Sequence, residues 1–167
     1  MSYSRATLLL MCLLVPIGCA SGKLKSASAT FDEFEMRRGP CPGDGSCPTY
    51  RVTLRRTGEI IFDGQKNVKA LGPQTAAIAP RELTILDEAL TRIDFFHLRE
   101  TYDANSDGCK RISTDMPSVT FEARTGATTK LVSYSMGCWG LPLGPRLRWL
   151  ADTVDELART QQWVPFW

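Results

Sequence analysis

Alternation of apolar and polar residues over 50–56, continued by inward-phase apolar residues over 59–63, is the feature that most restricts the fold of this chain. The alternating apolar residues are Tyr50, Val52, Leu54, Ile60 and Phe62, with Thr57-Gly58 between the two runs. A period of two puts these side chains on one face of a strand. Gly58 tolerates the positive φ that a tight turn requires. The segment therefore predicts a β-hairpin with one buried and one solvated face.

Two further segments have the same period. Residues 31–37 place Phe34 and Met36 on one face, and the opposite face receives Glu33, Glu35 and Arg37. Residues 117–124 and 129–134 flank a Thr125-Gly126 turn and predict a second hairpin, whose inward residues include Val119, Phe121 and Ala123. Residues 67–79 are less decided, and they leave open a short third returning strand followed by a loop.

Two segments have helical spacing instead. Pro80 is suited to a first helical position, and apolar residues follow it at intervals of three or four: Leu83, Leu86, Leu90 and Ile93. Gly144-Pro145 opens a second helix with the same spacing in Leu147, Leu150, Val154 and Leu157. Isolated helices between alternating strands predict an α+β fold, an antiparallel sheet built from hairpins with two amphipathic helices packed on one face.

The N-terminal residues predict export. One basic residue, Arg5, precedes an apolar run over 6–17 that is too short to span a bilayer, which indicates a signal peptide over 1–18. Small residues just before Cys19 resemble a lipobox, so we expect Cys19 to carry a lipid; the alternative is ordinary cleavage after Ala20. Residues 19–29 are small and polar and predict a flexible tether, and residues 30–167 predict a single globular domain.

Charge and anchoring define the expected partners. Removal of residues 1–18 leaves 149 residues with 19 basic against 18 acidic side chains. Near-neutrality argues against nucleic acid. Acyl chains on Cys19 would attach the domain to a membrane. We therefore expect a lipid-anchored protein in a bacterial cell envelope, on the periplasmic face of the outer membrane. Another envelope protein is a possible partner.

Four cysteines remain after export and lipidation: Cys41, Cys47, Cys109 and Cys138. An even number in an oxidising compartment predicts two disulfides. Four cysteines allow three pairings, and we favour Cys41 with Cys47 and Cys109 with Cys138, because the first pair is local and the second flanks a hairpin. Redox catalysis usually uses two cysteines two residues apart at a helix start, and zinc would need all four thiols reduced and convergent. We therefore expect structural staples and no metal.

A longer pattern around these cysteines resembles a known family. Cys47-Pro48-Thr49-Tyr50 leads into the hairpin, and Thr114-Asp115-Met116-Pro117, Lys130-Leu131-Val132 and the second helix also match. The pattern is similar to domain-of-unknown-function family 6438, often found on bacterial lipoproteins, over most of residues 30–163. The resemblance implies no catalytic residues. The 41–47 loop is longer than usual, and residues 138–144 look like an addition, so a function in these loops would be private to this protein.

Three other features are candidate sites. Asp103, Asn105 and Asp107 are spaced like the start of a calcium loop, but Thr114 stands where the bidentate glutamate belongs, and an ordinary polar loop has the same composition. Trp139, Leu141 and Leu143 form an apolar loop that is either a partner-binding tip or a cap on the core. His97 is the single histidine, without a nucleophile motif, and favours a structural or surface role.

These observations lead to a non-enzymatic binding or scaffolding domain without a cofactor. The loops near Cys41, Asp103 and Trp139 would be its partner-facing part. The alternative is an inhibitor of a secreted or envelope hydrolase, for which stapled loops would be pre-organised. A hydrolase that uses His97 is the weakest hypothesis, and it requires a concave pocket around that ring.

Overall fold

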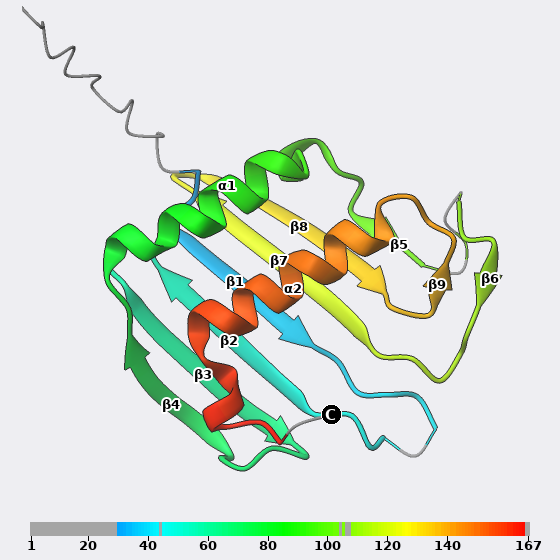
Figure 1. Cartoon of the computed structure of the whole chain (residues 1–167), viewed down its shortest axis with the longest axis horizontal. Coiled ribbons are helices and arrows are strands. Elements are labelled where there is room, and N and C mark those ends of the chain that lie inside the picture. The colour runs from blue at the N-terminus through cyan, green and yellow to red at the C-terminus, as the bar shows by residue number, and fades with distance from the viewer. Residues whose placement is uncertain (1–29, 44, 104, 106–107, 166–167) are drawn as a thin grey trace, which may run out of the picture.

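A computed structural model of the chain describes residues 30–43, 45–103, 105 and 108–165. The predicted signal peptide and tether lie outside these residues. One seven-stranded sheet forms the scaffold, in the order β4-β3-β2-β1-β7-β8-β5 (Figure 1). Its strands are β1 (Glu33–Arg38), β2 (Thr49–Arg55), β3 (Glu59–Lys66), β4 (Gly72–Ala77), β5 (Thr101–Tyr102), β7 (Ser118–Thr125) and β8 (Thr128–Ser135).

Strand β1 joins the two predicted hairpins into one sheet. It pairs antiparallel with β2 on one side and with β7 on the other, so the first strand in the sequence lies near the centre of the sheet. All neighbours are antiparallel except β5, which runs parallel to β8. The predicted inward residues of β1, β2, β3 and β7 are all buried. Alternation therefore fixes which face of each strand enters the core.

Two helices cover one face of the sheet, as expected for this α+β fold. The first helical segment is η1 (Pro80–Leu83) continued by α1 (Thr84–Arg92), with η2 (Phe95–His97) close behind; the second is α2 (Gly144–Ala158) followed by η3 (Thr160–Gln162). Figure 1 shows α1 and α2 crossing the same side of the strands, with the opposite face uncovered. Each helix buries its apolar stripe against the sheet, and of the eight predicted stripe residues only Leu157 is partly exposed.

Four strands have bounds that the sequence did not predict. Strand β4 settles the undecided segment as an edge strand on β3. The predicted polar loop over 100–115 contains β5 and also β6 (Arg111–Ile112), which pairs with β9 (Cys138–Trp139) in a separate two-stranded sheet. Three of these strands are two residues long, too short for a period to be visible. Within the described residues, no helix is long and apolar enough to cross a membrane.

Candidate partner-facing loop end

Three loops leave the sheet at one end, which we call the loop end: residues 39–48, 103–117 and 136–143. Strand β1 ends there and β2 begins there, and the antiparallel register of β1 with β7 brings the start of β7 and the end of β8 to the same end. Strand β5 runs parallel to β8, so the loop that follows it also leaves at this end. Figure 1 shows the three loops on the side where the β1 arrow points. The loops predicted to face a partner therefore lie at the same end of the sheet.

A disulfide closes the first loop. Cys41 pairs with Cys47 across six residues, with their Cα atoms 5.1 Å apart. The side-chain amide of Asn67 donates to the carbonyl oxygens of Gly45 and Cys47, at 2.6 and 3.2 Å. At the other end of the loop, the Gly39 N–H donates to the Ser118 carbonyl at 2.9 Å. The loop is thus held to both β3 and β7 sides of the sheet.

A second disulfide and a small ladder join the other two loops. Cys109 pairs with Cys138, again with a Cα separation of 5.1 Å. Next to it, the N–H of Lys110 donates to the Trp139 carbonyl at 2.7 Å, and the N–H of Ser113 donates to the Gly137 carbonyl at 3.0 Å. Both disulfides have the pairing that the sequence favoured. The covalent link and the backbone bonds together hold these two loops in one unit.

Trp139 lies at the centre of this unit, between two arginines. The guanidinium carbon of Arg148 is 4.7 Å from the indole centroid and that of Arg111 is 5.9 Å away. The indole Nε1 donates to the Ser113 hydroxyl at 3.1 Å. Arg148 also donates to the Tyr134 hydroxyl and to the Met136 carbonyl, at 3.2 and 2.6 Å. Cation–π contact and hydrogen bonds therefore fix the orientation of both the ring and the guanidinium.

A hollow of about 210 Å³ opens beside this ring, with Trp139, Arg148, Tyr134 and the first turn of α2 in its wall. The apolar loop over 139–143 serves mainly to close the core next to it. Leu141 is only 6% exposed, and Leu143 is partly buried against the core. Of the three predicted contact residues, Trp139 and Leu143 are half-buried, and Ile112 of β6 adds an exposed apolar side chain at 42%.

A buried ionic network, not predicted from the sequence, fixes α2 under the loop end. Arg38 is 5% exposed and donates from Nε and Nη2 to Asp155 Oδ2, at 2.9 and 2.6 Å. The hydroxyls of Tyr50 and Thr160 donate to Asp155 Oδ1, at 2.8 and 3.0 Å. Burial alone would lower the pKa of Arg38, but the charge and hydrogen bonds of Asp155, together with the charges of Tyr50 and Asp152, outweigh it and raise that pKa. Burial and the same carboxylate raise the pKa of Tyr50.

One feature of the sequence indicates this network. Arg38 continues the inward phase of Phe34 and Met36, so a charge stands where the alternation requires a buried side chain. A buried charge needs a partner, and the partner is 117 residues away on α2. A second hollow of about 190 Å³ adjoins the network, between Tyr50 and the residues after α2. Trp163 packs onto Phe62 beside it, with ring centroids 4.8 Å apart, so the last described segment docks on the core.

The remaining predicted sites do not converge. Cys19 lies outside the described residues, as does Asp107 of the calcium pattern, so that prediction stays open; among the residues that are described, no three His, Cys, Asp or Glu side chains gather as a metal site. His97 is 82% exposed and accepts or donates one hydrogen bond, at 2.6 Å to Asp94. An open surface surrounds that ring where the hydrolase hypothesis required a concave pocket.

Comparison with known proteins gives one result. The model of a family described as a domain of unknown function, DUF6438, matches residues 32–158, which includes the whole sheet and both helices. No curated protein matches the chain. The matched segment contains both disulfides and the Arg38–Asp155 network, and the resemblance noted on the cysteine step and the hairpin is confirmed over most of the chain. The chain therefore belongs to the DUF6438 family.

Proposed function

We propose that this protein is a lipid-anchored domain of the bacterial cell envelope that binds or scaffolds another envelope protein without catalysing a reaction. The observation that carries the proposal is the loop end: three loops from distant parts of the chain, one closed by its own disulfide and the other two joined by a second disulfide and presenting Trp139, Arg111 and Ile112. Tryptophan and arginine are enriched in the centres of protein interfaces. Loops that are fixed before contact lose little conformational entropy when a partner binds.

The test is affinity capture from solubilised envelopes with matched variants. Trp139→Ala and Ile112→Ser change the loop end, and Leu131→Ser is the control because Leu131 is comparably exposed, at 37%, on the open face of the sheet. We expect a specific protein to co-purify with wild type and with L131S and to be lost from W139A and I112S. Circular dichroism checks that all three variants fold. Equal recovery by all variants would contradict a partner site at the loop end.

The second candidate is inhibition of a secreted or envelope hydrolase. The stapled Cys41–Cys47 loop supports it, since the disulfide and the two hydrogen bonds from Asn67 pre-organise a short loop at the tip of the domain. The identity of the captured protein separates the two functions. A hydrolase whose activity falls on addition of the domain supports inhibition, and a structural envelope protein supports scaffolding.

The lipid anchor rests on the sequence pattern at Cys19 and is tested separately. Cells that produce the chain are labelled with a radioactive or clickable fatty acid, and wild type is compared with Cys19→Ser. We expect label in the wild type, recovery in the membrane fraction after spheroplasting, and loss of both in C19S. Equal labelling of C19S would contradict lipidation at this residue, while labelling of neither would favour ordinary cleavage after Ala20.

A further inference from the structure

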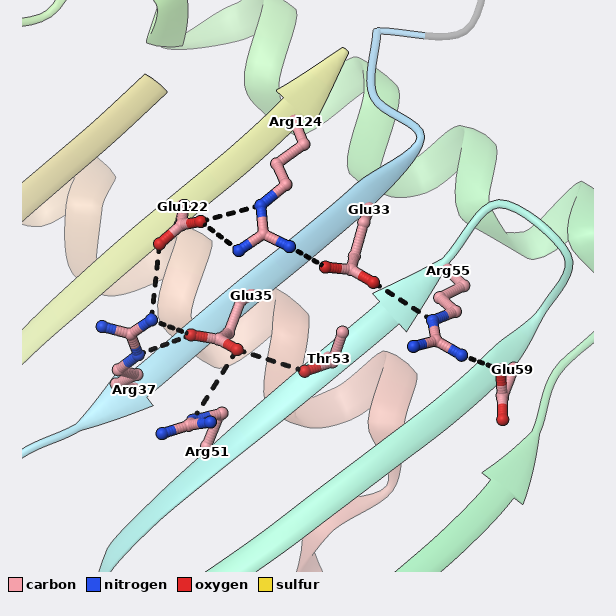
Figure 2. Close-up of polar contacts among 9 residues, drawn as sticks. All are labelled: Glu33, Glu35, Arg37, Arg51, Thr53, Arg55, Glu59, Glu122 and Arg124. Carbon is pink, nitrogen blue, oxygen red and sulfur yellow. Dashed lines mark hydrogen bonds and ion pairs between the residues drawn. The ribbon is translucent and has the colours of Figure 1, made fainter. Parts of the chain in front are cut away.

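Carboxylates accompany the arginines of the sheet on both of its faces. On the open face, Arg124 donates from Nε and Nη2 to Glu122, at 2.9 and 2.6 Å, and from Nη1 to Glu33 at 2.6 Å (Figure 2). On the helix side, buried Arg38 donates to Asp155. The positive charge of each of these guanidiniums is therefore matched by a negative charge from the same chain.

The cations around Trp139 are different, because they have no such partner. Arg111 lies directly opposite Trp139 in the register of β6 with β9, and Arg148 lies over the ring. The stem of Lys110 packs beside the same loop, since a Cβ at Gly140 would lie 2.9 Å from Lys110 Cβ and Cγ. None of these three cations forms an ion pair with a carboxylate of the residues that the structure describes. Positive charge therefore gathers at the loop end without a counterion from the described chain.

Arg148 is fixed on one edge and open on the other. Its Nε donates to the Tyr134 hydroxyl at 3.2 Å and its Nη2 to the Met136 carbonyl at 2.6 Å, and both acceptors are neutral. A guanidinium has more N–H groups than these two bonds use. Nη1 makes no hydrogen bond within the described residues and is not enclosed by the protein, so it is open to solvent. Nη1 and the second N–H of Nη2 form a fork that can bind both oxygens of a carboxylate.

The hollow beside Trp139 surrounds this fork. Its wall combines Arg148 with the indole and the apolar side chain of Leu141. Its volume of about 210 Å³ is smaller than the about 300 to 1,000 Å³ of pockets for drug-sized molecules, and it suits one side chain of a partner. The described acidic residues of the adjoining loops, Asp103 and Asp115, are not part of its wall. The hollow therefore offers apolar contacts to the methylenes of an incoming side chain and a cation to its charge.

We propose that this hollow binds an acidic side chain of a partner protein through the open fork of Arg148, with Trp139 against its methylenes. Arg111 and Lys110 then attract further acidic residues of the same segment. The inference rests on the proposed function and names the chemistry of its partner, an envelope protein with an exposed acidic segment. A partner that covers Arg148 removes water from a charge, which is costly unless a carboxylate replaces that water. The same positive charge speeds the approach of an acidic surface and disfavours a basic one.

The experiment is an NMR titration of the whole ¹⁵N-labelled chain, purified as cells process it, at constant ionic strength. The probe is a blocked tetrapeptide with two glutamates between glycines, and its counterpart with two glutamines is the matched control. The indole N–H resonance of Trp139, identified by its absence from Trp139→Phe, reports on the hollow. We expect a saturable shift of this resonance with the glutamate peptide, and binding of the glutamine peptide that is weaker by about tenfold or more.

Variants of the protein test the same contact. Arg148→Gln should weaken binding of the glutamate peptide about tenfold or more, and Arg111→Gln about twofold to fivefold, because Arg111 is exposed and its charge is screened. Arg81→Gln is the matched control, since Arg81 is also exposed but lies near the Gly58 turn at the opposite end of the sheet, and it should bind like wild type. Thermal melts check the fold of R148Q, and R111Q keeps the test valid if that variant unfolds.

Three results would overturn the inference: equal binding of the two peptides, equal weakening by R148Q and R81Q, or tighter binding of inorganic phosphate than of the glutamate peptide. Its failure is distinguishable from failure of the proposed function. A captured envelope protein that is lost from W139A but retained by folded R148Q and by R111Q contradicts the acidic contact and leaves the binding function standing. Glutamate-specific binding at Trp139 with no captured protein supports the acidic contact and counts against the scaffolding role.

Discussion

One carboxylate on each helix, Asp87 on α1 and Asp155 on α2, holds that helix to the sheet. Asp87 of α1 is 4% exposed and accepts bonds from Nη1 and Nη2 of Arg56, both at 2.8 Å. It also accepts from the backbone N–H and the hydroxyl of Thr30, at 3.0 and 2.6 Å. Arg56 lies 4.0 Å over the Phe31 ring and donates to the Phe31 carbonyl. One side chain therefore joins the helix, the entry to β1 and the turn after β2.

The Asp87 contacts predict a loss of stability in acid. Burial would raise the pKa of Asp87, but the hydrogen bonds from Arg56 and Thr30 outweigh it and lower that pKa. A lowered folded-state pKa gives a stabilisation that is complete above the unfolded value of about 4 and is lost as the pH falls through the folded value. Asp87→Asn should cost about 2 to 3 kcal/mol of unfolding free energy at pH 7.

Urea unfolding from pH 7 down to pH 2 measures this effect. The difference between wild type and D87N should begin to shrink as the pH drops below about 4, because Asp87 of the unfolded chain is protonated there, and it should be smallest once folded Asp87 is protonated at lower pH. Asp94→Asn is the control, since Asp94 is 74% exposed and its partner His97 is equally open. A constant difference between D87N and wild type across the whole range would show that the charge of Asp87 does not stabilise the fold.

Arg38 and Asp155 give a second prediction at the scale of residues. Asp155→Ala leaves the Arg38 guanidinium buried without its main partner, so we expect a loss of about 3 to 5 kcal/mol in unfolding free energy. Tyr50→Phe is the matched control, because it removes one of the hydrogen bonds to Asp155 and leaves the ion pair intact. It should cost about 1 kcal/mol. If chemical denaturation finds equal losses, the ion pair does not hold α2 to the sheet.

Among the elements, the hairpin turns combine two different constraints. Gly58 after β2 and Gly126 after β7 both have positive φ, at 90° and 56°. A Cβ at Gly58 would lie 2.3 Å from the Ile78 carbonyl oxygen, whereas at Gly126 nothing lies within 4 Å. The first glycine is required for space as well as for its backbone angle. The second is required for its angle alone.

Alanine substitution separates the two constraints. Gly126→Ala should lower the unfolding free energy by about 1 kcal/mol, the cost of a left-handed backbone for a residue with a Cβ. Gly58→Ala should cost about 1 to 3 kcal/mol more, because the β2–β3 turn must move away from the segment that leads into η1. Thermal or urea unfolding of both variants measures the difference. Equal losses would mean that this turn adjusts freely.

The elements that the sequence predicts are those with a visible period. The strand residues around Tyr50 and Phe121 and the helix stripe from Leu83 were expected on the correct faces and are buried. Strands β5, β6 and β9 have two residues each, and their pairing depends on partners far along the chain. The charged residues of the open face were also visible as outward positions. Their ion pairs were not, because Arg37 meets Glu122 only through the register of β1 with β7.

At the scale of the whole molecule, the position of the loop end depends on the order of the strands in the sheet. The sequence predicted hairpins and their faces, but the position of β1 between β2 and β7 brings the Cys41 loop to the same end of the sheet as the other loops. Local periodicity cannot specify this order, since it results from packing between β1 and β7. The two disulfides are then at the same end of the domain, but they enclose segments of different length. One closes six residues and the other spans 29.

This difference in enclosed length predicts that the two disulfides contribute unequally to the free energy of unfolding. A crosslink stabilises mainly by reducing the entropy of the unfolded chain, and the reduction grows with the enclosed length. Removing Cys41 and Cys47 as alanines should lower the unfolding free energy by about 2 kcal/mol, and removing Cys109 and Cys138 by about 3 to 4 kcal/mol. Cys138 is buried next to the Trp139 unit, so the second variant should also release the Trp139 indole, seen as a shift in tryptophan fluorescence.

Denaturant titration of the two double variants in the same buffer, with wild type before and after reduction, measures these values. The fully reduced wild type should lose about the sum, because the two crosslinks lie in different loops. A larger loss from the Cys41 and Cys47 variant would contradict the entropic account and indicate that the short staple also fixes the entry to β2. Insensitivity of the wild type to reductant would show that neither pair is oxidised in the purified protein, and it would remove the support for a pre-organised loop end.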